Sequence, residues 1–164
     1  FVKGYDGLPR FLTQLGQLGI KLAIFTSGTP HHIVRNIGVS LPELGLAELY
    51  KSTAMDDVEK LRLFEKTVTE YFAIPDFTVV TCDDVLTHKP DPASLVLAMQ
   101  RLGVTPEKSI VLGDHGVDMK AGINAGVPVR IGATHGFNGD QVLLDAGATQ
   151  VIHSLDELTN QLAA

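Results

Sequence analysis

Two carboxylates between Ser109 and Gly126 carry the clearest chemistry in this chain. A short apolar run ends in Gly113-Asp114, and Asp118 follows four residues later, at the start of a segment rich in glycine and alanine. Two acidic residues at the carboxyl end of a strand, beside the N-terminus of a helix, suit a hard cation and a phosphate group. This stretch therefore predicts a site for a metal ion and an anion.

The elements that must position these carboxylates alternate along the chain. Short apolar runs predict buried strands, and apolar residues at helical spacing predict the helices between them. Such an order predicts an α/β fold, a three-layer Rossmann-like parallel sheet with helices on both faces. Strands are expected at 21–25, 77–81, 109–112, 128–131 and 150–153, and helices at 8–18, from 30, and at 55–72, 92–102, 118–125, 139–146 and 155–162.

Three segments with polar or charged residues come just after expected strands. They are Thr26-Ser27, the loop from Asp83 to Lys89, and Asp114. In an open parallel sheet the ligand sits beyond the carboxyl ends of the strands. We therefore expect all three segments to share one rim.

Composition narrows the classes of function. A length of 164 residues suits one domain, residues 1–164, and 45% apolar residues suit a globular protein. The net charge of −6 argues against a nucleic-acid or membrane-surface binder, and no stretch is apolar enough to span a bilayer. The single cysteine, Cys82, favours a reducing cytoplasm. The chain begins at Phe1 without an initiator Met or a signal-peptide pattern, so we expect a fragment or a processed form.

Three motifs together resemble those of the haloacid dehalogenase-like (HAD) hydrolases, especially the phosphoglycolate phosphatase-like branch. The strand ending in Thr26 is similar to the second motif, Lys89-Pro90-Asp91-Pro92 to the third, and the GDxxxD string from Gly113 to Asp118 to the fourth. The AGxxAG string 121–126 and the segments 145–148 and 154–158 are similar to the family's usual tail, and 5–9 to the turn leading into the second motif.

The resemblance implies a phosphatase that uses magnesium and an aspartyl-phosphate intermediate to hydrolyse a small phosphate ester. It implies that Asp114 binds the metal directly and that Asp118 supports it directly or through water. It implies that Thr26 and the Ser27 amide donate hydrogen bonds to a phosphate oxygen, and that Lys89 neutralises the charge there.

The first motif of this family, an apolar strand followed by Asp-x-Asp, is absent from the sequence. The nearest string, 4–8, has Gly4 in the place of the nucleophile, and we interpret Asp6 as a turn residue. In the family this strand is central, so its loss would leave two neighbouring strands with unpaired edges. An upstream segment outside this sequence, a strand supplied by a partner, or a rearranged sheet without catalysis would each account for its absence. We favour the first.

A second departure is a helical insertion of about thirty residues at 39–73, between the second and third motifs, and no cap domain follows a first motif. The insertion could form a small lid, but an enlarged peripheral helix is the simpler interpretation. A third departure is His115, which could contact the substrate or be merely tolerated at its position.

The remaining candidates have structural explanations. Adjacent histidines point to different faces of a helix, so His31 and His32 suit a solvated helix start better than a metal site. Cys82 has no CxxC partner and is expected to be a small buried residue. The histidines 88, 135 and 153 lack ligand spacing, and the glycines 132–139 do not form a phosphate-binding GxxxxGK and are expected to form a loop.

Two functions are compatible with these residues. The first is a HAD-like phosphatase module whose nucleophile lies outside this chain, so that the fragment alone is inactive. The second is a non-catalytic module of the same fold that keeps a phosphate or metal site. A receiver-like or dinucleotide-binding domain is a weaker third, because the sequence has no GxGxxG and does have Lys89-Pro90.

Overall fold

The computed structural model describes residues 6–134 and 139–164. Tyr5 and His135, and half of the glycine-containing loop expected at 132–139, lie outside the described residues, while Gly132 lies in a strand instead of the loop. In the described part Asp6 occupies a turn, as its interpretation from the sequence requires. No helix in the described ranges combines the length and the apolar character needed to cross a membrane.

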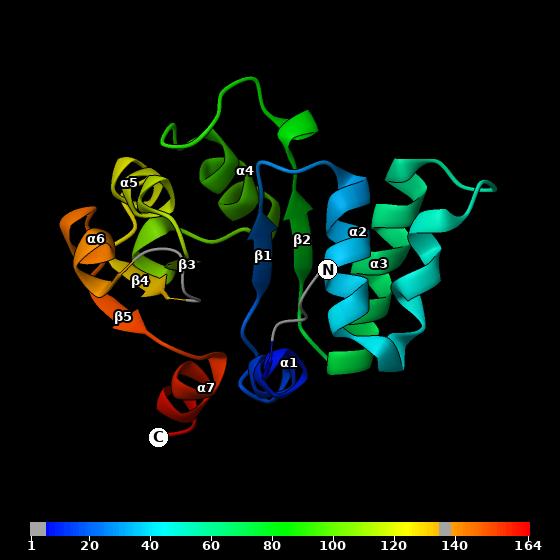
Figure 1. Ribbon diagram of the computed structural model, residues 1–164, viewed down its shortest axis with the longest axis horizontal. Coiled ribbons are helices and arrows are strands. Elements are labelled where there is room, and N and C mark those ends of the chain that lie inside the picture. Colours follow the sequence, from blue (N-terminus) through cyan, green and yellow to red (C-terminus); the bar gives the residue numbers. More distant parts are fainter. Residues whose placement is uncertain (1–5, 135–138) are drawn as a thin grey trace.

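The strands are parallel, as the sequence predicts, and in the described residues they form two sheets. The first pairs β1 (Leu22–Phe25) with β2 (Phe77–Val80). The second has the order β3-β4-β5, with β3 (Ile110–Gly113), β4 (Val129–Ala133) and β5 (Gln150–Ile152). Figure 1 shows β1 and β2 upright in the middle of the molecule and β4 and β5 on the left, lying at a steep angle to them. Between β1 and β3 no described strand joins the two sheets.

The helices begin and end within about two residues of their expected bounds. Local signals explain this agreement: Pro30 stands at the start of its helix, where a missing N–H costs nothing, and Asp56 forms a capping box with Glu59. The helices are α1 (Leu8–Gln17), α2 (Pro30–Ser40), α3 (Asp57–Phe72), α4 (Ala93–Leu102), α5 (Gly116–Asn124), α6 (Asp140–Asp145) and α7 (Leu155–Ala163).

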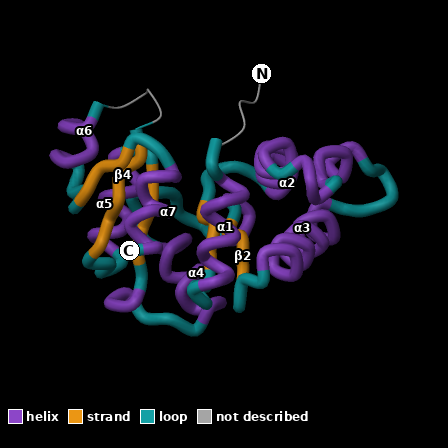
Figure 2. Tube along the Cα trace, turned by 90° about the horizontal axis from the view of Figure 1, so that it is seen from below, coloured by secondary structure: helices purple, strands orange, loops and turns teal. Residues whose placement is uncertain are grey.

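Two hydrophobic clusters lie on opposite faces of the strands. Ile24 of β1 and Leu112 of β3 pack against the first, the α1-side cluster, with Phe11, Leu15 and Leu158 among its members. Val111, which precedes Leu112, belongs to the second, the α5-side cluster, with Leu95, Met119 and Leu143. Phe25, which follows Ile24, packs against that cluster. Successive side chains of a strand point to opposite faces. The sheets are therefore covered on both faces, and Figure 2 shows α1 and α7 along one of them.

The segment 39–73 extends the side of the molecule beyond β2. It contains the short 3-10 helices Pro42–Leu44 and Leu46–Lys51 and then α3. Figures 1 and 2 show α2 and α3 together on the side of β2 that faces away from β3. Phe64 and Val68 of α3 are fully buried in the α1-side cluster. The segment is thus part of the packed core at this edge.

The outer edge of β2 is closed by side chains instead of another strand. The amide of Val79 donates to Glu65 Oε1 at 2.6 Å, and Arg101 Nη1 donates to the carbonyl of Val79 at 3.0 Å. Burial raises the pKa of the Glu65 carboxyl, although the Val79 amide and Arg101 favour its charged form. The backbone N–H and C=O of Val79, which is fully buried, are thus both hydrogen-bonded.

Replacing Glu65 with alanine is expected to lower the free energy of unfolding by about 1–3 kcal/mol, because the buried Val79 amide loses its acceptor. Urea unfolding monitored by circular dichroism measures the change. Glu70→Ala on the same helix is the control, because Glu70 is exposed and its ion pair with Lys66 is 3.9 Å long; it should cost less than about 0.5 kcal/mol. Equal losses in both variants would contradict the role given to Glu65.

Candidate active site

Thr26 and Ser27 form the turn that follows β1. The Thr26 amide extends the pairing with β2 by donating to the Val80 carbonyl at 2.9 Å. Its hydroxyl oxygen accepts a hydrogen bond from the Gly28 amide at 2.9 Å, which holds the turn closed. Thr26, Ser27 and Lys89 line a small recess of about 10 Å³ together with Ser94, whose buried hydroxyl has no partner in the described residues. A recess of this size is large enough for roughly one water molecule.

Lys89 is held in the rim by two contacts of its own side chain and by one contact of its loop. Its Nζ forms an ion pair with Asp118 Oδ1 at 2.5 Å and lies 4.9 Å from the centre of the Phe25 ring. Asn124 Nδ2, at the end of α5, donates to the Pro90 carbonyl at 2.9 Å and so fixes the loop that carries Lys89. Lys89 and Asp118 are 14% and 6% exposed, so the pair is largely withdrawn from water.

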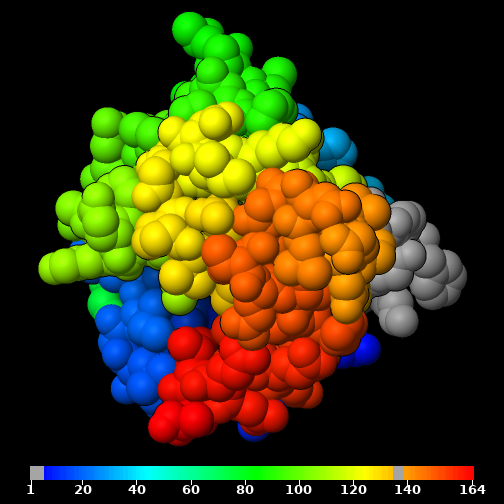
Figure 3. Space-filling view, turned by 90° about the vertical axis from the view of Figure 1, so that its left-hand side faces the viewer, coloured from blue at the N-terminus to red at the C-terminus, as the bar shows by residue number. Residues whose placement is uncertain are grey.

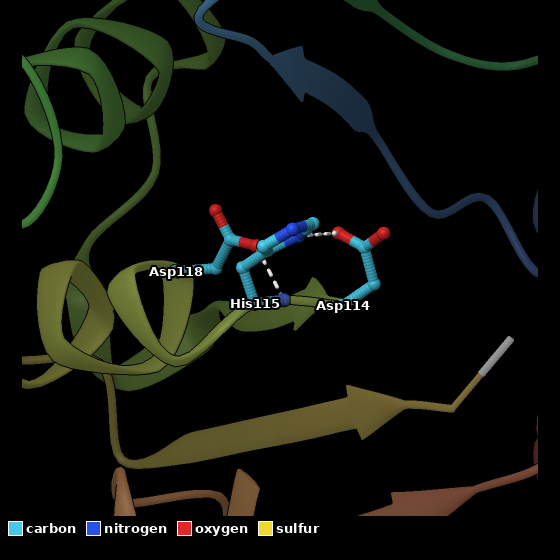
Figure 4. Close-up of side chains that lie close together, drawn as sticks. All are labelled: Asp114, His115 and Asp118. Atoms are coloured by element: carbon cyan, nitrogen blue, oxygen red, sulfur yellow. Dashed lines mark hydrogen bonds and ion pairs between the residues drawn. The ribbon is translucent and has the colours of Figure 1, made fainter. Parts of the chain in front are cut away.

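Asp114, His115 and Asp118 come from the junction between β3 and α5. His115 Nδ1 lies 2.8 Å from Asp114 Oδ1, and the His115 amide donates to Asp118 Oδ2 at 3.1 Å. His115 is the N-cap of α5 and Asp118 the third residue of its first turn. Asp118 therefore has a capping role as well as its ion pair. Figure 4 shows the three side chains gathered beyond the end of β3.

A glycine allows this close packing. A Cβ atom on Gly113 would lie 2.4 Å from Asp118 Cβ and 2.8 Å from its Cγ and Oδ2. Any larger residue at position 113 would push Asp118 out of place. The glycine of the GDxxxD string is thus needed for the approach of α5 to β3.

Ligand atoms of Asp114, His115 and Asp118 all lie within 4.8 Å of one another, close enough to share one ion. The two carboxylates supply the oxygen ligands that magnesium prefers. The imidazole nitrogen, in contrast, suits transition metals better than magnesium. The carboxylates therefore fit a magnesium ion, and His115 fits the role of a neighbour that orients Asp114.

The structure brings the predicted site residues to one end of one cavity. Thr26, Lys89, Asp114 and Asp118 line the same cavity of about 860 Å³, and Ser27 lines the adjoining recess. Of the histidines set aside from the sequence, His88 lines this recess. The ring of His31 packs on Tyr50, and His32 Nδ1 lies 3.1 Å from Thr29 Oγ1.

Sequence reasoning missed two residues of the site. The pairing of His115 with Asp114 was not foreseen, although their adjacency after a strand is a signal that could have suggested it. The contact of Asn124 with Pro90 joins residues 34 positions apart, and no local pattern announces it.

Replacing Asp114 with asparagine is expected to lower the pH at which His115 titrates. The hydrogen bond and the charge of Asp114 raise the pKa of His115, with a smaller contribution from Asp118. A raised pKa favours the folded state when the imidazole is protonated, and this contribution is lost as the pH rises through the folded-state value. NMR titration of the histidine ring protons measures the shift. Glu70→Gln, on α3 beyond β2, should leave the His115 curve in place; an unchanged curve in Asp114→Asn would refute the pairing.

Comparisons with known proteins show the class of protein to which this chain belongs. The model of the haloacid dehalogenase-like hydrolases matches residues 2–126, so the chain belongs to this family. The α/β fold and the resemblance drawn from the motifs are thereby confirmed.

Individual relatives and solved structures show which members of the family this chain resembles. A phosphoglycolate phosphatase from Salmonella typhi is 34% identical over 91 residues, which are 56% of this chain and 34% of that protein. A phosphorylated carbohydrates phosphatase from Thermotoga maritima is 31% identical over 124 residues, 76% of this chain and 54% of that protein. A solved structure from Thermotoga maritima, provisionally named a beta-phosphoglucomutase, matches 96% of this chain with a TM-score of 0.69 and 27% identity. The match covers 59% of that structure, so the chain spans about half the length of its relatives.

Proposed function

We propose that this chain is the greater part of the catalytic core of a magnesium-dependent phosphatase that acts on a small phosphorylated organic compound. The observation that carries the proposal is the position of Thr26, Lys89, Asp114 and Asp118 at one end of a single cavity. The names of the relatives, phosphatases of phosphoglycolate and of phosphorylated carbohydrates, support the same class of substrate. Cys82, the single cysteine, remains compatible with a cytoplasmic protein.

Each residue has a distinct task in this proposal. The Thr26 hydroxyl and the Ser27 amide donate hydrogen bonds to the phosphate, and Lys89 offsets its negative charge as a point charge. Asp114 binds magnesium directly, and Asp118 keeps both Lys89 and the first turn of α5 in place while facing the same ion. When bound, magnesium supplies positive charge that makes the phosphorus more open to attack.

The nucleophile is proposed to lie outside this sequence. A carboxylate there attacks phosphorus, the bond to the alcohol oxygen breaks, and an aspartyl-phosphate forms that water then hydrolyses. No described acidic residue other than Asp114 and Asp118 lines the cavity at this end, and both already have other tasks. The chain by itself is therefore proposed to bind phosphate without turning over an ester.

Hydrolysis of p-nitrophenyl phosphate by the complete protein with magnesium tests the catalytic proposal. Asp114→Asn is expected to lower kcat by about 100-fold or more, because a preorganised charge at the reacting group is lost. Glu70→Gln changes an exposed carboxylate on α3, beyond β2, and should leave the rate within about twofold of the unchanged protein. Absence of phosphate release from the complete protein would abandon the assignment in favour of a module that only binds an anion or a metal. In that case calorimetry with orthophosphate should still show binding that Asp114→Asn weakens.

A further inference from the structure

Ser94 is a buried polar residue to which the proposed function gives no task. It is the second residue of α4 and only 6% exposed, and its hydroxyl group has no hydrogen-bond partner in the described residues. A buried hydroxyl without a partner costs free energy, because the group has given up its hydrogen bonds to water. Buried polar side chains in folded proteins nearly always have a partner, which is either protein or an ordered water molecule.

The surroundings of this hydroxyl contain room for such a partner. Ser94 lines the recess of about 10 Å³ that also borders Thr26, Ser27 and Lys89. Three segments meet there, namely the first turn of α4, the turn 26–27 and the loop 87–89. The volume corresponds to about one water molecule. A phosphate ion, with five heavy atoms, is too large for it.

The chain between the loop and α4 folds back, so that both of its ends border the recess. The Asp91 amide donates to the His88 carbonyl at 3.0 Å, and the Ala93 amide donates to Asp91 Oδ1 at 2.9 Å. His88 and Ser94, which stand at the two ends of these turns, both line the recess. Local hydrogen bonds thus fix where Ser94 lies relative to the loop that carries Lys89.

The opposite wall of the recess is tied to the turn after β1. The Cys82 amide donates to the Gly28 carbonyl at 3.2 Å, and Cys82 also lines the recess. On the outside, Asn124 of α5 donates to the Pro90 carbonyl, and Figure 3 shows the green surface of this loop next to the yellow surface of α5. The walls are therefore held in place by hydrogen bonds that do not involve Ser94.

The start of α4 favours an oxygen atom in the recess. The first four N–H groups of a helix have no partner within it, and the helix dipole adds a partial positive charge there. α4 has ten residues, and its N-cap, Pro92, provides no side-chain hydrogen bond to the first turn. A water molecule fits the recess in size, and it can both donate to and accept from a hydroxyl group.

We propose that the recess holds one ordered water molecule, bound by the Ser94 hydroxyl, which joins α4 to the turn 26–27 and the loop 87–89. Its remaining hydrogen bonds go to polar groups of these two segments, since a buried water makes about three. Ser94 stands two residues beyond the string 89–92 and acts through the water as a positioning residue. It keeps the turn and the loop at the spacing that a phosphate group needs. This role rests on the proposed function, whereas the water site itself does not.

Binding of orthophosphate tests the positioning role. In calorimetry of the complete protein with magnesium, Ser94→Ala is expected to raise the Kd for orthophosphate about 3–10-fold, because one water-mediated link is lost. Ser52→Ala is the matched control. Its hydroxyl accepts from the Ala54 amide at 3.3 Å and lines neither the recess nor the cavity, so the Kd should stay within about twofold.

The kinetics of p-nitrophenyl phosphate hydrolysis separate positioning from a structural role. With Ser94→Ala, KM should rise by the same factor as the Kd, while kcat stays within about twofold, because the lost link serves the ground state and the transition state alike. A residue that only supported the fold would lower the amount of active protein and hence kcat, and would leave KM unchanged.

Two further measurements test the water without reference to phosphate. A high-resolution crystal structure of the unchanged protein should show a water molecule within hydrogen-bond distance of Ser94 Oγ. The urea midpoint of Ser94→Ala should lie at or below that of the unchanged protein. If the hydroxyl were truly unpaired, its removal would relieve a cost and raise the midpoint.

Four results would overturn the proposal. They are an unchanged Kd in Ser94→Ala, a raised urea midpoint, the absence of water density at Ser94 Oγ, and a phosphate oxygen bonded directly to that atom in a complex with orthophosphate. If the unchanged protein binds no orthophosphate, the phosphatase proposal and the positioning role fall together. The density and the midpoint then still decide whether Ser94 binds the water.

Discussion

Replacing Lys89 with methionine is expected to lower the free energy of unfolding by about 3–5 kcal/mol. Methionine keeps most of the side chain's packing against Phe25 but removes the ammonium group, which leaves the Asp118 carboxylate, 6% exposed, without its cation. Breaking a buried pair from one side is costly because the remaining charge has lost both water and its partner. Urea unfolding of the two proteins measures the loss.

A second substitution provides the control for this loss. When Asp118→Asn is added to Lys89→Met, the unpaired carboxylate charge is removed, and about 1–3 kcal/mol of the free energy of unfolding should be recovered. The same substitution made alone should destabilise the protein. Lys120→Met changes an exposed lysine on α5 and is expected to stay within about 0.5 kcal/mol. If the double variant is no more stable than Lys89→Met, the ion pair does not carry the effect.

Replacing Gly113 with alanine is expected to displace Asp118 and with it the rim of the site. The added Cβ would lie 2.4 Å from Asp118 Cβ, a distance that no rotamer of Asp118 relieves, since its Cβ is fixed by the backbone of α5. Overpacking of this kind costs about 1–3 kcal/mol of stability. Because the carboxylate also moves, the affinity for magnesium should fall about 10–100-fold, as when a residue that orients a metal ligand is lost.

Gly139→Ala is the matched control for this substitution. An added Cβ at Gly139 meets nothing within 4 Å, and the φ of −67° there is one that alanine adopts readily. Urea unfolding and calorimetric titration with magnesium should find this variant unchanged. Magnesium binding that survives Gly113→Ala at full strength would show that Asp118 does not depend on the approach of α5 to β3.

Local patterns in the sequence were sufficient for the elements of this fold. The apolar run before Thr26 and the alternation of helical and strand patterns predicted the strands and helices to within about two residues. Pro30 and the capping pair of Asp56 and Glu59 act over one helical turn, so they can be recognised without knowledge of the rest of the chain. The family followed from three motifs whose glycine, lysine and aspartates stand at fixed spacings.

The tertiary structure alone decided which groups meet. The sequence predicted parallel strands, but only the structure shows that the described strands pair as two sheets, because a sheet continues only where a strand is present to pair, and no described strand lies between β1 and β3. The ion pair of Lys89 with Asp118 joins residues 29 positions apart, and the capping of Val79 by Arg101 joins residues 22 apart. Such contacts depend on how helices pack across strands, and a pattern that repeats over one helical turn or a few strand residues holds no information about them. The sequence by itself thus determined the elements, the family and the set of candidate residues. Packing determined that the described strands form two sheets and which partner each charge meets.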